Sequence, residues 1–138
     1  MKRTHLLFLT LCLLTFSPFG YSQKETNKHD SCYKVYKIKP IGNCYQIYAK
    51  RDGEYFKIIS KKDTVAVGEK IRIGKCYLFN LKSRAELAPV IDGVKILPMN
   101  YLDITYMYWG TPIKIDGDKI TDLYFADNIA GLYFTGSK

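Results

Sequence analysis

The sequence is poor in histidine and lacks the short motifs that mark many catalytic and cofactor sites. Its 138 residues include only His5 and His29, and contain no Cys-x-x-Cys pair, phosphate-binding glycine loop or Gly-x-Ser-x-Gly segment. Cys/His zinc sites, P-loops and serine hydrolase elbows each need one of these patterns. We therefore expect a protein that is not an enzyme and that holds no cofactor or metal ion.

Long hydrophobic runs are also absent. The longest uncharged apolar run, Leu6–Phe16, has 11 residues, which is well short of the roughly 20 needed to span a bilayer. A basic head precedes this run, and small residues, Gly20 and Ser22, come just before Gln23. This layout is typical of a secretory signal peptide over residues 1–22. We expect an exported protein, periplasmic, cell-surface or secreted, without a transmembrane span after cleavage.

The rest of the chain is long enough for one domain. Residues 23–31 are polar and predict a flexible tail, and residues 32–138 predict a single domain. Charge is uneven along the chain: residues 23–84 hold 15 basic and 6 acidic residues, and residues 85–138 hold 4 basic and 7 acidic ones. Such polarity would suit anionic partners, but solubility and electrostatic fit within one fold are the preferred explanation.

Alternating apolar residues and three Asp-Gly pairs predict antiparallel β-structure. The Asp-Gly pair at 52–53 separates two alternating runs, which predicts a hairpin with a two-residue turn. The last third differs, because Ile120, Leu123 and Tyr124 fall at helical spacing and Gly131 follows. We predict a short helix over 118–128 and a final strand over 132–134. The other expected strands cover residues 33–39, 44–50, 55–60, 70–82 and 102–109. The strand over residues 70–82 is expected to bend at Gly74.

Two segments carry a resemblance to a known fold. The hairpin of residues 45–60, followed by residues 67–79, resembles the early strands of an OB-fold-like barrel, as in small exported bacterial proteins that are mostly uncharacterised. The resemblance covers about half of the mature chain. Together with the strand pattern, it implies a mainly β fold: a small antiparallel OB-fold-like barrel with one short C-terminal helix.

Three cysteines remain after the predicted cleavage, so one disulfide and one unpaired thiol are expected in an oxidising compartment. Cys32, Cys44 and Cys76 each precede a tyrosine and lie on the strand face opposite to it. All three therefore face the same side if the tyrosines face the core. We favour a Cys44–Cys76 bridge, and the remaining thiol is either buried or paired with another chain.

A candidate ligand face combines basic and aromatic side chains on several expected strands. OB-folds bind oligosaccharides and single-stranded nucleic acids on such faces, with rings stacking beside cations. Export makes a glycan or another polyanion a better match than nucleic acid. The alternative is an ordinary solvated sheet face, where lysine discourages edge pairing. The candidate residues are Tyr36, Tyr48, Lys50, Tyr55, Lys57 and Arg72.

Two further segments have simpler explanations. Acidic residues from Asp116 to Asp127 partly match a calcium loop, but Thr121 stands where glycine is required, so we interpret them as a turn and a helix cap. Tyr101 and the run from Tyr106 to Trp109 are dense in aromatics. Core packing is the expected role of that run, and an exposed Tyr-Trp edge would be a contact site.

The sequence thus predicts an exported, non-enzymatic binding or interaction module of the bacterial periplasm or cell surface. The alternative is a carbohydrate- or polyanion-binding protein that uses the basic and aromatic face. An enzyme or inhibitor with a reactive free cysteine is a third hypothesis. The expected partners are an envelope protein, an extracellular glycan or a polyanion, and no nucleic acid is expected.

Overall fold

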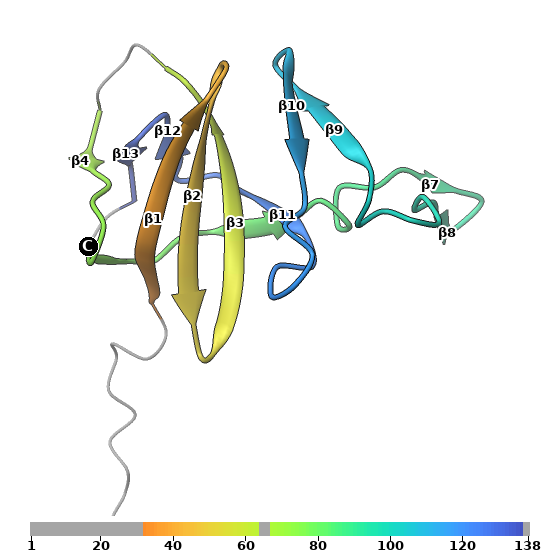
Figure 1. Cartoon of the computed structure of the whole chain (residues 1–138), viewed down its shortest axis with the longest axis horizontal. Coiled ribbons are helices and arrows are strands. Elements are labelled where there is room, and N and C mark those ends of the chain that lie inside the picture. Colours follow the sequence, from red (N-terminus) through yellow and green to blue (C-terminus); the bar gives the residue numbers. More distant parts are fainter. Residues whose placement is uncertain (1–31, 64–66, 137–138) are drawn as a thin grey trace, which may run out of the picture.

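The computed structural model describes residues 32–63 and 67–136, and within these ranges the chain is all β, with no helix (Figure 1). The predicted signal peptide and polar tail lie outside the described residues. No helix in the described ranges has the length and apolar character needed to cross a membrane. The prediction of a mainly β chain is confirmed.

The first three strands form an antiparallel meander: β1 (Tyr33–Ile41), β2 (Cys44–Arg51) and β3 (Glu54–Lys61). Arg51 pairs with Glu54, so the loop between β2 and β3 is Asp52-Gly53. Both loop residues have positive φ, 50° and 85°, as a type I′ turn requires. The predicted hairpin is confirmed.

The meander continues into a six-stranded sheet of order β5-β1-β2-β3-β11-β6, with β5 (Cys76–Tyr77), β6 (Leu81–Ser83) and β11 (Leu123–Ala126). β3 and β11 are parallel, and the other pairs are antiparallel. β5 and β6 are close neighbours in the chain but pair with opposite edges of the sheet. The sheet must therefore curl into a half-barrel so that residues 76–83 reach both edges, as Figure 1 shows.

The expected continuous strand over residues 70–82 is wrong, although the bend at Gly74 is confirmed. Gly74 has a φ of 87°, which glycine adopts without strain. Its N–H donates to the Val35 carbonyl at 2.7 Å, and the Val35 N–H donates to the Lys75 carbonyl at 3.0 Å. Residues 71–75, which contain this bend, separate the short strand β4 (Glu69–Lys70) from β5, which lies beside β1.

The predicted helix over residues 118–128 is also wrong, because this stretch contains β11. Leu123 pairs with Lys57 of β3, and Phe125 pairs with Lys82 of β6. A strand between two open sheet edges gains backbone hydrogen bonds on both sides. Tertiary pairing of this kind overrides a weak local helical spacing.

Three small sheets complete the fold. β4 pairs with β13 (Tyr133–Phe134), which confirms the final strand, and β13 pairs with β12 (Ile129–Ala130). β9 (Thr105–Tyr108) pairs with β10 (Thr111–Lys114), and β7 (Val90–Ile91) pairs with β8 (Val94–Lys95) through the Asp92-Gly93 turn. Gly117 also marks a turn, but no strand pair flanks it.

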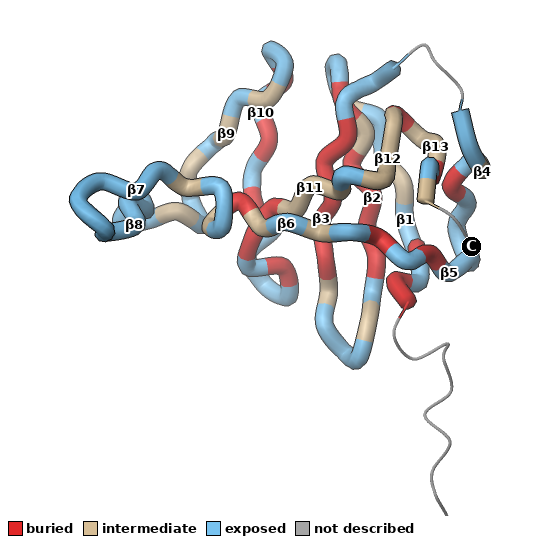
Figure 2. The backbone as a smooth tube through the Cα atoms, turned by 180° about the vertical axis from the view of Figure 1, so that it is seen from behind, coloured by how far each residue is buried: buried red, intermediate tan, exposed pale blue. Residues whose placement is uncertain are grey.

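The core has two clusters, because β2 and β3 are buried on both faces, as the red segments in Figure 2 show. The first cluster includes Ile47 and Ile58 and lies inside the curl, where Ile71 and Phe134 contribute. The second lies on the outer face of the meander. Its buried members are Cys44, Tyr48, Ile59, Ile113, Ile115, Ile120 and Leu123.

The long connection between β6 and β11 has two parts. One part covers the outer face of the meander, and we call it the outer layer. The other part forms an arm. Asn43, in the β1–β2 turn, holds the β9–β10 turn: its N–H donates to Thr111 Oγ1 at 2.8 Å, and its Nδ2 donates to the Trp109 carbonyl at 2.9 Å. Residues 85–104, which we call the arm, carry the β7–β8 hairpin away from the sheet and are largely exposed (Figures 1 and 2).

Candidate functional site

The structure gathers part of the predicted ligand face into a groove of about 840 Å³, which we call the basic groove. It lies at the end of the meander that holds the β2–β3 turn. Three of the six predicted residues, Tyr36, Lys50 and Tyr55, line it, together with Lys34 and Arg51.

Adjacent strands bring the groove's cations and rings into one row. Lys34 of β1 pairs with Lys50 of β2, which pairs with Tyr55 of β3. Lys50 Nζ lies 5.2 Å from the centroid of the Tyr55 ring. Neither lysine forms an ion pair with an acidic side chain of the described ranges. Two like charges on directly opposite positions repel, so an anion bound between them would relieve this repulsion.

Tyr36 adds a second ring to the groove. The register between β1 and β2 shifts at this residue, which is therefore a β-bulge. Its ring stands edge-on to Tyr55, with centroids 5.9 Å apart. Partial burial raises the pKa of Tyr36 above its usual value, so the hydroxyl stays neutral. The groove thus combines two aromatic rings with an excess of positive charge.

Tyr48 and Lys57 are not part of an exposed face, because the segment after β10 covers them. Lys57 is 2% exposed and donates to the Lys114 carbonyl at 2.7 Å and to Asp116 Oδ1 at 3.1 Å. Burial lowers the pKa of Lys57, and Asp116 opposes this shift. Burial also raises the pKa of Tyr48. Lys57 therefore fastens the outer layer to the sheet.

Arg72, the sixth predicted residue, is exposed between β4 and β5 and does not line the basic groove. Its backbone N–H donates to the Tyr77 hydroxyl at 2.9 Å. The bend at Gly74 removes Arg72 from the strand parity on which the prediction depended.

The disulfide joins Cys32 to Cys76, with Cα atoms 5.6 Å apart, so the predicted Cys44–Cys76 bridge is wrong. Lys34 of β1 pairs with Cys76 of β5, and this pairing sets the start of β1 beside Cys76. Cys44 begins β2 at the far end of the sheet, where it is fully buried. Its Sγ donates to the Tyr108 carbonyl at 3.5 Å. A disulfide is consistent with an oxidising, exported environment.

The Cys44 thiol should therefore be inert in the folded protein. We expect a thiol reagent such as DTNB to label none of the native mature chain within minutes, and to label one thiol per chain in 6 M guanidinium chloride. Burial prevents the reagent from reaching the sulfur. Equal labelling rates in both conditions would contradict this and would support the hypothesis of a reactive cysteine.

A second groove, of about 810 Å³, lies between the arm and strands β9 and β11, and we call it the apolar groove. Its lining includes Leu97 from the arm, Met107 and Trp109 from the β9 hairpin and Phe125 from β11. Ten of the fourteen large exposed hydrophobic residues in the described ranges lie within residues 87–109. Core packing, the expected role of residues 106–109, holds only in part, because Met107 and Trp109 are exposed and line this groove. Sequence patterns did not indicate the wall formed by the arm, whose short segments have no regular periodicity.

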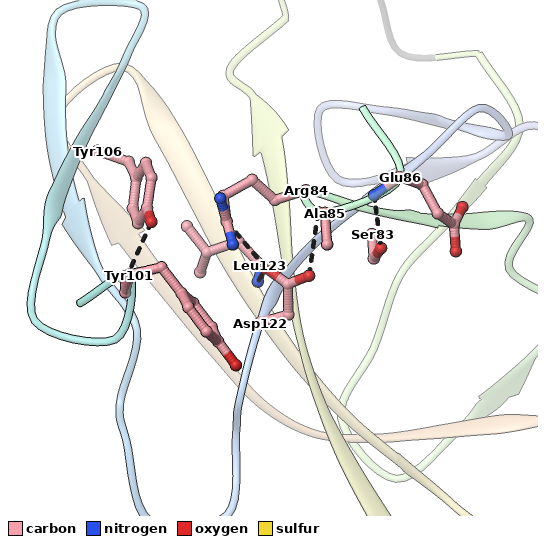
Figure 3. A network of polar contacts seen from close by, with 8 residues as sticks. All are labelled: Ser83, Arg84, Ala85, Glu86, Tyr101, Tyr106, Asp122 and Leu123. Carbon is pink, nitrogen blue, oxygen red and sulfur yellow. Dashed lines mark hydrogen bonds and ion pairs between the residues drawn. The ribbon is translucent and has the colours of Figure 1, made fainter. Parts of the chain in front are cut away.

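Arg84 is the one charged residue in the lining of the apolar groove. Its Nε donates to Asp122 Oδ1 at 3.0 Å. The guanidinium carbon lies 4.8 Å from the Tyr106 ring centroid and 5.2 Å from that of Tyr101. Figure 3 shows this arrangement, with the Arg84 side chain extending to Asp122 and the two rings. Arg84 is 9% exposed, and its Nη2 is buried without an acceptor in the described part of the chain.

The acidic residues after β10 do not form a calcium site. Asp116 pairs with Lys57, Asp122 with Arg84, and Asp127 with Lys82. Within residues 32–63 and 67–136, no three His, Cys, Asp or Glu side chains gather as metal ligands would. The turn at Gly117 is present, but the expected helix cap is wrong because no helix follows.

The chain matches no protein-family model, no curated protein and no solved structure. The residues themselves must therefore carry the functional argument.

Proposed function

We propose that the protein is an exported, non-enzymatic binding module that holds an acidic polysaccharide in the basic groove. The observation that carries this proposal is the row Lys34–Lys50–Tyr55 with Tyr36 beside it. The two unpaired ammonium groups attract carboxylates, and the two rings offer flat apolar faces on which sugars pack.

The strand connections support an OB-fold-like barrel as the scaffold of this module. An antiparallel meander leads into a bent segment, residues 76–83, that pairs with both β1 and β11. OB-folds bind their ligands beside strands 2 and 3. Here the layer around Ile113 and Ile120 covers much of that face, which leaves the basic groove at one end as the open part.

The ligand chemistry follows from the charges around the groove. Lys119 lies nearby, with Nζ 5.2 Å from the Tyr55 ring centroid. Of the acids, Asp52 lines the groove but is 3.7 Å from Arg51, which compensates its charge. The lysines therefore remain in excess, and binding to an anionic polymer should weaken as salt screens the charges.

The test is titration calorimetry of the mature chain, residues 23–138, with polygalacturonate, and with neutral dextran as a control. We expect Lys50→Glu to weaken polygalacturonate binding at least tenfold, about 1.4 kcal/mol. Lys95→Glu makes the same charge change on the exposed arm, outside the groove, and should leave binding within twofold.

Equal losses in the two variants would show that only net charge matters, and would overturn the proposed groove. Binding of dextran as tight as that of polygalacturonate would do the same. A cross-linked pull-down from cell envelopes distinguishes the main alternative, because one stoichiometric protein partner without glycan would identify a protein-interaction module instead.

A further inference from the structure

Arg84, in the lining of the apolar groove, has a hydrogen-bond donor that no group in the described residues satisfies. Asp122 Oδ1 accepts from Arg84 Nε at 3.0 Å and from the Leu123 N–H at 2.8 Å, while Oδ2 accepts from the Ala85 N–H at 3.1 Å. The carboxylate thus accepts three hydrogen bonds, one of them from Arg84 Nε and none from Arg84 Nη2. Arg84 Nη2 is left buried and without a partner in the described residues, which is unfavourable for a charged group.

The tyrosines beside Arg84 hold the guanidinium without supplying this acceptor. The Tyr106 hydroxyl donates to the Tyr101 carbonyl at 2.9 Å, so that carbonyl is already engaged. The ring faces interact with the positive charge. The side chain is therefore fixed in place beside the groove, and its Nη2 has no acceptor in the described part of the chain (Figure 3).

The remaining wall of the groove suits a hydrocarbon chain better than a peptide. Pro89 and Pro98 in the lining have no backbone N–H, and the Ile96 N–H already donates to the Pro89 carbonyl at 2.9 Å. An extended peptide needs backbone partners along its length, and the arm side of the groove offers few. The volume of about 810 Å³ lies within the range of small-ligand sites.

We propose that the apolar groove binds a long-chain fatty acid, with its alkyl chain along Leu97 and Met107 and its carboxylate toward Arg84, whose buried Nη2 it reaches when the side chains that cover this atom move aside. Charge complementarity decides the head group, because Arg84 is the one charged residue among the described residues of the lining. This site goes beyond the proposed function. It lies on the connection between β6 and β11 rather than at the β2–β3 turn, and it takes a different ligand.

The protein contains its own reporter, since Trp109 is the single tryptophan of the chain and lines the apolar groove. We expect energy transfer from Trp109 to cis-parinaric acid bound to the mature chain, and displacement of this probe by palmitate. Methyl palmitate, which has the same chain but no charge, should displace it at least tenfold less well. Equal displacement by acid and ester would overturn the role of Arg84.

Two methionine variants test the place of binding without touching the buried ion pair. Met107 lines the groove and is 64% exposed, whereas Met99 is 95% exposed and lies outside the lining. Met107→Glu should weaken the affinity for cis-parinaric acid at least tenfold, and Met99→Glu should leave it within twofold. Both positions are exposed, so both variants should fold.

Absence of energy transfer in the wild-type chain would overturn the proposal, as would equal weakening in the two variants. Displacement of the probe by strand-forming peptides, but not by palmitate, would assign the groove to a protein partner instead. Lys50→Glu should leave parinaric acid binding unchanged, so failure at this site and failure at the basic groove are distinguishable.

Discussion

Loss of the Cys32–Cys76 bridge should destabilise the domain by about 4 kcal/mol, as the chain-entropy relation gives for a closed loop of 44 residues. The bond links the start of β1 to β5, and so restricts the unfolded chain over the whole meander. For a domain of about a hundred residues, this corresponds to a melting temperature lower by roughly 15 °C or more. Thermal denaturation of Cys32→Ser/Cys76→Ser, followed by circular dichroism, measures the effect.

Dithiothreitol provides the matching control for this experiment. It should lower the melting temperature of the wild-type chain to that of the double variant, and should leave the double variant itself unchanged. Cys44→Ser keeps the bridge and should retain sensitivity to the reductant. An unchanged melting temperature in the double variant would mean that the core alone determines stability.

The second large effect is expected for Asp122, because its removal leaves the buried positive charge of Arg84 without a partner. Arg84 and Asp122 side chains are 10% and 12% exposed. Asp122→Ala removes the acceptor of Arg84 Nε and of two backbone N–H groups, and we expect a loss of about 3–5 kcal/mol in the free energy of unfolding. Urea denaturation of the mature variant measures this loss.

Asp127→Ala is the matched control, because it removes the Lys82–Asp127 ion pair from the surface. This pair is as close, with Nζ and Oδ2 at 2.7 Å, but the side chains are 52% and 60% exposed. Exposed pairs contribute little to stability, so the control should unfold close to the wild-type midpoint. Similar midpoints for the two variants would contradict the special role of the buried pair.

The meander could be predicted from sequence because its signals are local. Asp52-Gly53 between two alternating runs determines a two-residue turn and thereby the register of β2 against β3. The bend at Gly74 has the same origin. Such turns and bends depend only on residues that are neighbours in the sequence, so the sequence alone is enough to predict them.

The candidate site was predicted only in part, because alternation along a strand shows two faces but not what covers them. Lys50 and Tyr55 stay open, whereas Lys57 on the same face lies beneath Asp116. The disulfide prediction was wrong for a related reason. The three cysteines have equal local sequence contexts, so which two of them form the bridge depends on where β5 joins the sheet. Arg84 gave no sequence signal, since its burial depends on Asp122, 38 residues later.

The parallel pairing of β3 with β11 has a consequence for how the chain reaches its native state. The meander joins neighbouring segments and can form early, but Leu123 must find Lys57 across the whole outer connection. Phe134 completes the first core cluster from nearly the end of the chain. Contacts between such distant residues raise the relative contact order, which slows folding. We therefore expect the hydrophobic interior of the curled sheet to close only after β11 and β13 have docked, and to stay exposed until then.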